Sequence, residues 1–131
     1  MRSISNLVIA AVLAAGVPGA AVSAQAADES RHCFFSSQFK NWRAADEKTL
    51  YIRVGVNRYF RLDLAASCRT ALWPDATMIT VFRGSNLVCS ALDWDVKVSQ
   101  RVNGIPQACM VSKMTELTEA EAAALPRKVK P

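Results

Sequence analysis

Four cysteines, Cys33, Cys68, Cys89 and Cys109, follow an N-terminal segment with the features of an export signal, and this combination constrains the fold most. Their spacing contains no Cys-x-x-Cys pair, which argues against a zinc knuckle or a thioredoxin-like redox site. An even number of cysteines in an exported chain of this size predicts two structural disulfides. Each disulfide should contribute roughly 3–5 kcal/mol, which is comparable with the net stability of a small domain.

Residues 1–24 carry the features of a signal peptide. Leu7–Val17 is an apolar run, and Val22-Ser23-Ala24 offers the small residues that signal cleavage requires. The run covers about 17 Å of helix, which is less than the roughly 30 Å core of a bilayer, so we expect no membrane span. We expect cleavage after Ala24, or after Ala26 as a nearly equal alternative. The mature protein is expected in the periplasm or the medium.

The chain after the signal is long enough for one domain and too short for two. We expect a flexible leader over residues 25–32, one disulfide-bridged β-rich domain over residues 33–126 and a basic tail over residues 127–131. The sequence has 16 Lys and Arg against 11 Asp and Glu, a net charge of +5, and Arg2 leaves with the signal. This mild excess is compatible with attraction to an anionic partner and demonstrates none.

Short runs of alternating apolar residues predict a mainly β fold. The clearest runs, Leu50–Val54 and Tyr59–Leu64, flank Gly55-Val56-Asn57, which suits a three-residue hairpin loop in which Asn tolerates the left-handed last position. Less regular strands are expected at residues 35–42, at 79–83 and 87–90 as a second hairpin, at 94–98 and at 108–114. The capping-box pattern Thr118-Glu119-Ala120-Glu121 predicts one short helix, which Pro126 ends. About six short strands and a C-terminal helix indicate a small antiparallel barrel or sandwich.

The first hairpin carries the most interesting predicted surface. We prefer the register that places Tyr51 opposite Arg61 and Arg53 opposite Tyr59, because a shift by two would oppose two arginines. Two tyrosines and two arginines on one face could hold an anionic or glycan ligand by charge and stacking. They could equally satisfy one another as cross-strand cation–π pairs, and we prefer this second interpretation.

Two other groups of residues are candidate sites. His32 beside Cys33 could form a nucleophile pair, but an unpaired thiol would leave an odd number of cysteines for bridging, so His32 is interpreted as exposed and incidental. Asp93 and Asp95 could bind Ca²⁺ or perform acid–base catalysis. However, Ca²⁺ needs about six to eight oxygens and no other acidic cluster is near in sequence. We prefer a solvated strand face with Trp94 in the core, and we expect no catalytic residue, metal or cofactor.

The sequence leaves three disulfide pairings open. We prefer Cys33–Cys109 together with Cys68–Cys89. The first bridge would tie the first strand to the last, as closure of a barrel requires. The second would join the loop after one hairpin to a strand of the next.

The chain has a series of landmarks in fixed order: Cys33 before Trp42, the first hairpin, Cys68 just after it, Cys89-Ser90 followed by Asp93, then Cys109 and the ending Met114–Glu121. In the order and spacing of these landmarks the chain resembles a family of small exported proteins of Gram-negative bacteria, domain of unknown function 6491. The resemblance implies export, four paired cysteines and a single domain. It implies no activity, ligand or catalytic residue.

The leading functional hypothesis is a non-catalytic exported module that binds an envelope component, for which the basic charge favours an anionic partner. We expect a monomer with no nucleic-acid partner. One alternative is a small secreted hydrolase that uses Asp93 or Asp95. A second is an inhibitor of a secreted hydrolase, although two basic partners such as this chain and a lysozyme would repel each other during encounter.

Overall fold

The computed structural model describes residues 32–100 and 104–131. The signal predicted at residues 1–24 and the leader up to residue 31 lie outside this range. The strands are β1 (Phe34–Phe35), β2 (Phe39–Ala44), β3 (Thr49–Val54), β4 (Arg58–Leu64), β5 (Ala76–Phe82), β6 (Leu87–Val88), β7 (Trp94–Gln100), β8 (Gln107–Ala108) and β9 (Val111–Glu116). The helices are the 3-10 turns η2 (Ser36–Gln38), η3 (Arg69–Leu72) and η4 (Ala91–Asp93), and the α-helix α2 (Glu119–Ala124).

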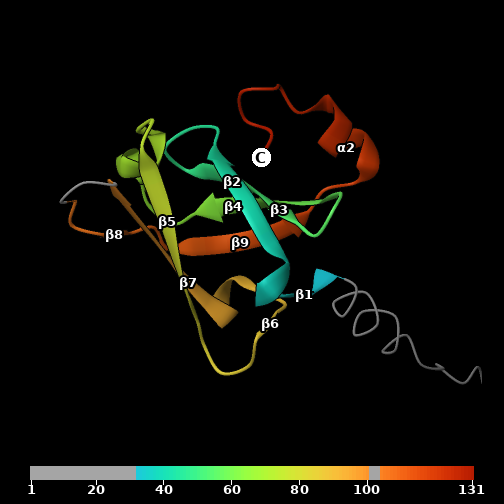
Figure 1. Ribbon diagram of the computed structural model, residues 1–131, viewed down its shortest axis with the longest axis horizontal. Coiled ribbons are helices and arrows are strands. Elements are labelled where there is room, and N and C mark those ends of the chain that lie inside the picture. The colour runs from blue at the N-terminus through green and yellow to red at the C-terminus, as the bar shows by residue number, and fades with distance from the viewer. Residues whose placement is uncertain (1–31, 101–103) are drawn as a thin grey trace, which may run out of the picture.

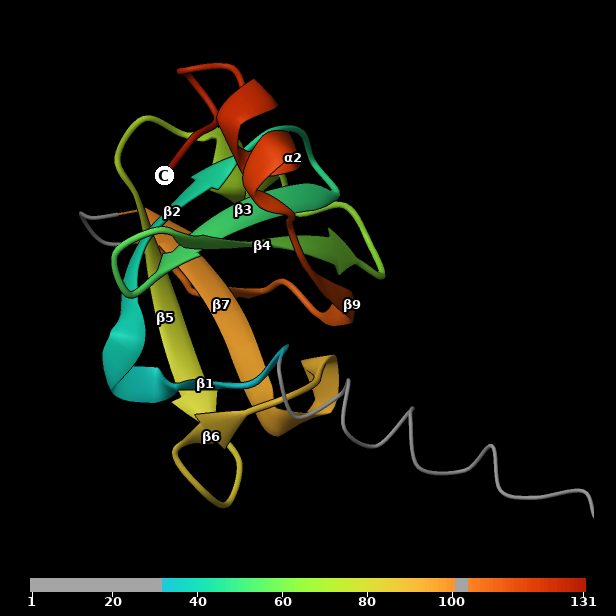
Figure 2. The same cartoon turned by 90° about the vertical axis from the view of Figure 1, so that its right-hand side faces the viewer.

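The described strands form three antiparallel sheets, which confirms the mainly β prediction (Figure 1). Their orders are β2-β3-β4-β9, β5-β7-β8 and β1-β6. The arrangement is sandwich-like and the described strands do not close into a barrel. Figure 2 shows the C-terminal helix and tail on the far side of the four-stranded sheet from β5 and β7.

The core forms where the alternating strands turn their apolar sides toward one another. Most of the buried side chains come from β3, β4 and β7, together with one residue each from β1 and β6: Leu50, Ile52, Val54, Phe60, Leu62, Leu64, Trp94, Val96, Val98, Phe34 and Val88. The intervening residues of β3 and β4 face outward. The predicted placement of Trp94 in the core is therefore confirmed.

The predicted hairpin forms between β3 and β4 in the preferred register. Tyr51 lies opposite Arg61 and Arg53 opposite Tyr59. The strands join through residues 55–57, and Gly55, the first of them, has φ +62°. A side chain at this φ would strain the backbone, so glycine suits this turn.

The prediction of a second hairpin, between residues 79–83 and 87–90, is wrong. β5 pairs along its whole length with β7, and β6 pairs with β1 through Phe34 opposite Val88. The physical reason is burial, because β7 alternates Trp94, Val96 and Val98 into the core and offers β5 a seven-residue partner. The short β6 instead covers the edge of the core with β1.

Two further strands differ from their predicted spans. The turn η2 separates β1 from β2 within the predicted strand at residues 35–42. The predicted strand at residues 108–114 is divided into β8 and β9, and between them the Cys109 N–H donates to the Val96 carbonyl at 2.8 Å. The break allows Cys109 to remain beside β7 while β9 continues to the other sheet.

Two disulfides form as predicted in number, but the preferred pairing is wrong. Cys33 bonds Cys89, with Cα atoms 4.1 Å apart, and Cys68 bonds Cys109, with Cα atoms 5.6 Å apart. The predicted pairing, Cys33–Cys109 and Cys68–Cys89, assumed that the first strand meets the last. The first strand instead pairs with β6, so Cys33 comes to lie beside Cys89.

The capping box predicted for the C-terminal helix is confirmed. The Thr118 hydroxyl accepts from the Glu121 N–H at 3.2 Å, and the Glu121 carboxylate accepts from the Thr118 N–H at 2.8 Å. After Pro126 the chain makes a turn in which the N–H groups of Val129 and Lys130 donate to the Pro126 carbonyl. Val129 is buried, so the basic tail is part of the folded unit.

Candidate functional site

The four residues of the predicted ligand surface lie together on the outer face of the β3–β4 hairpin, as expected from their register. The alternate residues of both strands are buried in the core, which directs these four side chains away from it. They do not form the predicted cross-strand cation–π pairs. Among the described residues, the cation–π contacts are Lys130 over Tyr59, with Nζ 5.4 Å from the ring centroid, and Arg58 over Phe60.

Arg61 contributes little free charge to this face. Its Nε donates to Asp63 Oδ1 at 2.8 Å, and this hydrogen bond raises the pKa of the guanidinium. The carboxylate of Asp63 therefore neutralises it locally. The hollow beside Arg61 has a volume of about 560 Å³ and is closed on one side by α2 residues such as Glu121 and Ala124.

Arg53 is placed differently. It lies between Asn41 of β2 and Tyr59 of β4 in the sheet register. Its Nε is buried and has no hydrogen-bond partner in the described part of the chain. An arginine stays charged at any physiological pH, so Arg53 brings an uncompensated positive charge to this face.

A second hollow continues the face toward β5, with a volume of about 330 Å³. Arg43 of β2 and Lys128 of the tail both line it, opposite Leu72 and Trp73. Trp73 is 55% exposed and Leu72 is also exposed, although both are large and apolar. The hollow therefore combines two cations with an exposed aromatic side chain.

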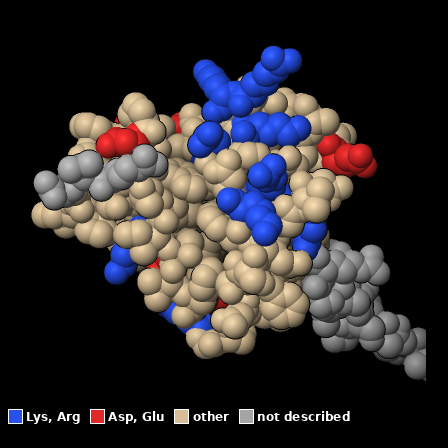
Figure 3. Space-filling model, viewed as in Figure 1, with Lys and Arg blue, Asp and Glu red and all other residues tan. Residues whose placement is uncertain are grey.

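These residues define what we call the cationic–aromatic face: Arg43, Arg53, Tyr59, Trp73, Lys128 and Lys130. The described ion pairs of lysine and arginine involve Arg58, Arg61, Arg69 and Arg83, so none of the four cations of the face is paired with an acid. Figure 3 shows Lys and Arg gathered over β2 and the C-terminal segment, with acidic side chains toward the margins. The face thus presents concentrated positive charge beside exposed apolar surface.

Residues 1–130 match the family described as Family of unknown function (DUF6491). The chain belongs to this family. No curated protein and no solved structure matches it. The family description gives no activity.

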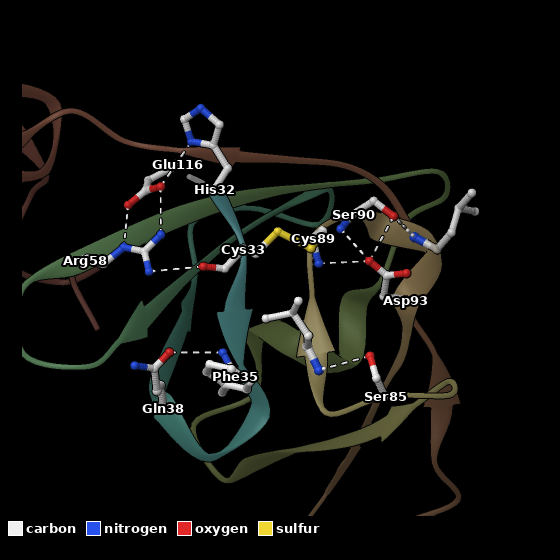
Figure 4. The surroundings of a disulfide bond; sticks show 12 residues. His32, Cys33, Phe35, Gln38, Arg58, Ser85, Cys89, Ser90, Asp93 and Glu116 are labelled. Carbon is white, nitrogen blue, oxygen red and sulfur yellow. Dashed lines mark hydrogen bonds and ion pairs between the residues drawn. A yellow bond between two sulfur atoms is a disulfide. The ribbon is translucent and has the colours of Figure 1, made fainter. Parts of the chain in front are cut away.

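The two carboxylates that the sequence offers for catalysis, Asp93 and Asp95, both accept hydrogen bonds from other residues of the fold. Asp93 Oδ2 accepts from the N–H groups of Cys89 and Ser90 at 2.8 and 2.7 Å (Figure 4). The Cys89 hydrogen bond is the main reason that the pKa of Asp93 is lowered. Asp95 is hydrogen-bonded by Arg83, which lowers its pKa in turn. A general acid must hold a proton near the working pH, so neither group suits that role.

His32 is exposed, as predicted, but its position is not incidental, because it has a structural partner. Its Nδ1 lies 3.1 Å from Glu116, which also accepts two hydrogen bonds from Arg58 at 2.6 and 2.9 Å. Burial by itself would raise the pKa of Glu116, but the hydrogen bonds from Arg58 and His32 outweigh it and lower the pKa. Arg58 also donates to the Cys33 carbonyl, so this cluster fastens β9 beside the Cys33–Cys89 disulfide (Figure 4).

A groove of about 790 Å³ also lies beside the Cys33–Cys89 disulfide. Its polar groups are committed to the fold, since Arg58 binds Glu116, Asp93 caps η4 and the Gln38 side chain accepts from the Phe35 N–H at 3.0 Å. It therefore offers a ligand fewer polar contacts than the cationic–aromatic face does.

Sequence reasoning identified Arg53 and Tyr59 of this face and missed Arg43, Trp73 and the two tail lysines. The basic tail was visible as a cluster of charge, but a charge cluster does not reveal which surface it folds against. The exposed Trp73 has no sequence signal of its own, because a tryptophan between Leu72 and Pro74 is equally compatible with a buried position.

Proposed function

We propose that this DUF6491 protein is a non-catalytic exported module that associates with the anionic lipid surface of an envelope membrane through its cationic–aromatic face. The observation that carries the proposal is the group of four cations without acidic partners beside the exposed Trp73. The association is peripheral. Among the described residues, no helix has the length and apolar character needed to cross a bilayer.

The physical basis is the sum of two modest effects. Each Lys or Arg held near an anionic bilayer contributes about 1 kcal/mol, and the contribution falls off within a Debye length. Tryptophan favours the level of the lipid headgroups, where its ring is shielded from water and its N–H remains solvated. The hollow between Arg43, Lys128 and Trp73 brings both effects to one place.

Export is supported by the covalent framework. Two disulfides persist in an oxidising compartment and are rare in the cytosol. They are compatible with a periplasmic or extracellular protein, and the predicted signal at residues 1–24 would deliver the chain there. An envelope membrane is the anionic lipid surface that such a protein meets.

Neutralising the two tail lysines should weaken membrane binding. For Lys128→Gln/Lys130→Gln, we expect affinity for phosphatidylglycerol-containing vesicles to fall about thirtyfold, since two cations are removed. Vesicle co-sedimentation measures the change. The matched control is Lys97→Gln/Lys113→Gln, which makes the same change in net charge at positions next to acids, because Lys97 neighbours Asp95 and Lys113 lies opposite Asp63.

The control should bind within a few-fold of the wild type. Equal losses in the two double variants would mean that net charge alone governs binding and would contradict a defined face. Unchanged binding in the tail variant would mean that Lys128 and Lys130 are not part of the binding site.

A further inference from the structure

β5 lies at the edge of its sheet, and it is unusually long and apolar for an edge strand. In the described sheets its hydrogen-bonded neighbour is β7 alone, at the end of the order β5-β7-β8. None of its seven side chains is buried, and the segment Ala76–Phe82 contains no charge, glycine or proline. Edge strands of this kind are templates for pairing with another strand.

The backbone groups at this edge are set by the pairing with β7. The Arg83 N–H donates to the Asp93 carbonyl at 2.7 Å, so the odd-numbered residues of β5 point their N–H and C=O groups toward β7. The even-numbered residues Met78 and Thr80 therefore direct theirs to the free edge. Ile79 and Val81 are exposed on the outer face of the sheet.

β2, a six-residue strand at one edge of the four-stranded sheet, is protected against pairing with another strand. In β2 the Trp42 N–H is satisfied by the Asn41 side chain at 2.8 Å, and Lys40 and Arg43 place charges along the strand. Such devices prevent strand addition. β5 has none between its ends.

We propose that the free edge of β5 pairs with the same edge of a second copy of this chain, antiparallel and with the two-fold axis at Ile79. In this register Met78 of one copy exchanges backbone hydrogen bonds with the partner's Thr80. Ile79 faces the partner's Ile79, so exposed apolar side chains meet across the axis. The two three-stranded sheets become one sheet of six strands.

The charges that flank β5 select this register. Asp75 precedes the strand, is exposed and has no described ion pair. Arg83 follows the strand and donates to Asp95 through Nε and Nη2, but its side chain is 59% exposed and its Nη1 makes no described hydrogen bond, so a second carboxylate can bind there. The two-fold at Ile79 places Asp75 opposite the partner's Arg83, on both sides of the axis. A slip by two residues loses both pairs. The strand is therefore complementary to itself in charge as well as in backbone groups.

The proposed dimer differs from the monomer expected from the sequence, and it does not rest on the proposed membrane function. The sequence could not reveal the edge, because the predicted hairpin assigned β6 to the position beside β5.

A cysteine placed at the axis tests the register. All four native cysteines are in disulfides, so Ile79→Cys adds one thiol to each copy. Residues facing each other in a non-hydrogen-bonded pair have Cα atoms about 4.5 Å apart, within the range for a disulfide. Mild oxidation of Ile79→Cys should yield a covalent dimer on a non-reducing gel. In Thr77→Cys the two thiol-bearing residues are roughly 14 Å apart along the strands, and crosslinking should be at least several-fold lower.

The wild type supplies a readout that needs no variant. Sedimentation should show a dimer, and the amides of Met78 and Thr80 should exchange hydrogen more slowly as protein concentration rises. Ile79→Lys, which opposes two like charges at the axis, should sediment as a monomer, whereas Val56→Lys in the exposed hairpin loop should remain a dimer. A wild type that sediments as a monomer at all soluble concentrations overturns the proposal, as does equal crosslinking of the two cysteine variants.

Discussion

Replacing Cys68 and Cys109 together by alanine is expected to lower the free energy of unfolding by about 4 kcal/mol, as the chain-entropy relation gives for a loop of this length. Cys68 follows β4 in the four-stranded sheet, and Cys109 is hydrogen-bonded to Val96 of β7 in the other sheet. The bridge thus joins the two layers that enclose the core. Since small domains have net stabilities of roughly 5–15 kcal/mol, much of the stability should be lost.

Urea denaturation followed by circular dichroism measures this loss, and thiol titration of the unfolded protein checks the pairing. The Cys68→Ala/Cys109→Ala variant should show no free thiols, because Cys33 and Cys89 remain bonded to each other. The control Cys68→Ala/Cys89→Ala should show two, from Cys33 and Cys109. The opposite pattern would restore the pairing preferred from the sequence.

Trp94→Ala should destabilise the protein by about 3–5 kcal/mol, the usual cost of deleting a large buried aromatic side chain. Trp94 is 2% exposed, and its ring meets those of Phe34, Phe39 and Phe82 at centroid distances of 5.9, 6.5 and 6.1 Å. These rings come from β1, β2 and β5. Removing Trp94 therefore opens a cavity where all three sheets meet.

Trp73→Ala is the matched control, since it deletes the same side chain from an exposed position. The urea concentration at the midpoint of unfolding should be nearly the same for Trp73→Ala as for the wild type. If Trp94→Ala were no more damaging than Trp73→Ala, the description of the core would be contradicted.

The parts of the fold that could be predicted from the sequence are those governed by near neighbours. Alternation in Leu50–Val54 and Tyr59–Leu64, with a short loop between them, specified both the hairpin and its register. Thr118 and Glu121 specified the start of α2 in the same way, because a capping box involves residues three apart.

The parts that could not be predicted depend on contacts between distant segments. Two-residue strands such as β1 and β6 have no alternation to detect, yet their pairing determines that Cys33 meets Cys89. The sequence pattern is equally compatible with β5 pairing with the nearer β6 and with β5 pairing with β7. Only burial of the β7 side chains distinguishes the two.

The residues of the cationic–aromatic face also divide into those placed by near neighbours and those placed by contacts between distant segments. Arg53 and Tyr59 lie on the locally determined hairpin and were identified together. Arg43 joins them through the β2–β3 pairing, and Lys128 and Lys130 join through the turn after Pro126, which returns the tail to the sheet. Arg61, which was included from the sequence, is neutralised by a neighbour two residues away.

Binding of the wild-type protein to vesicles as salt rises tests the central claim most directly. Vesicles that contain phosphatidylglycerol should retain the protein at low ionic strength and release it progressively through physiological strength, where the Debye length is about 8 Å. Vesicles of phosphatidylcholine alone should retain little at any salt concentration. Equal retention by both kinds of vesicle, or binding to the anionic vesicles that does not change with salt, would contradict the role assigned to the four cations.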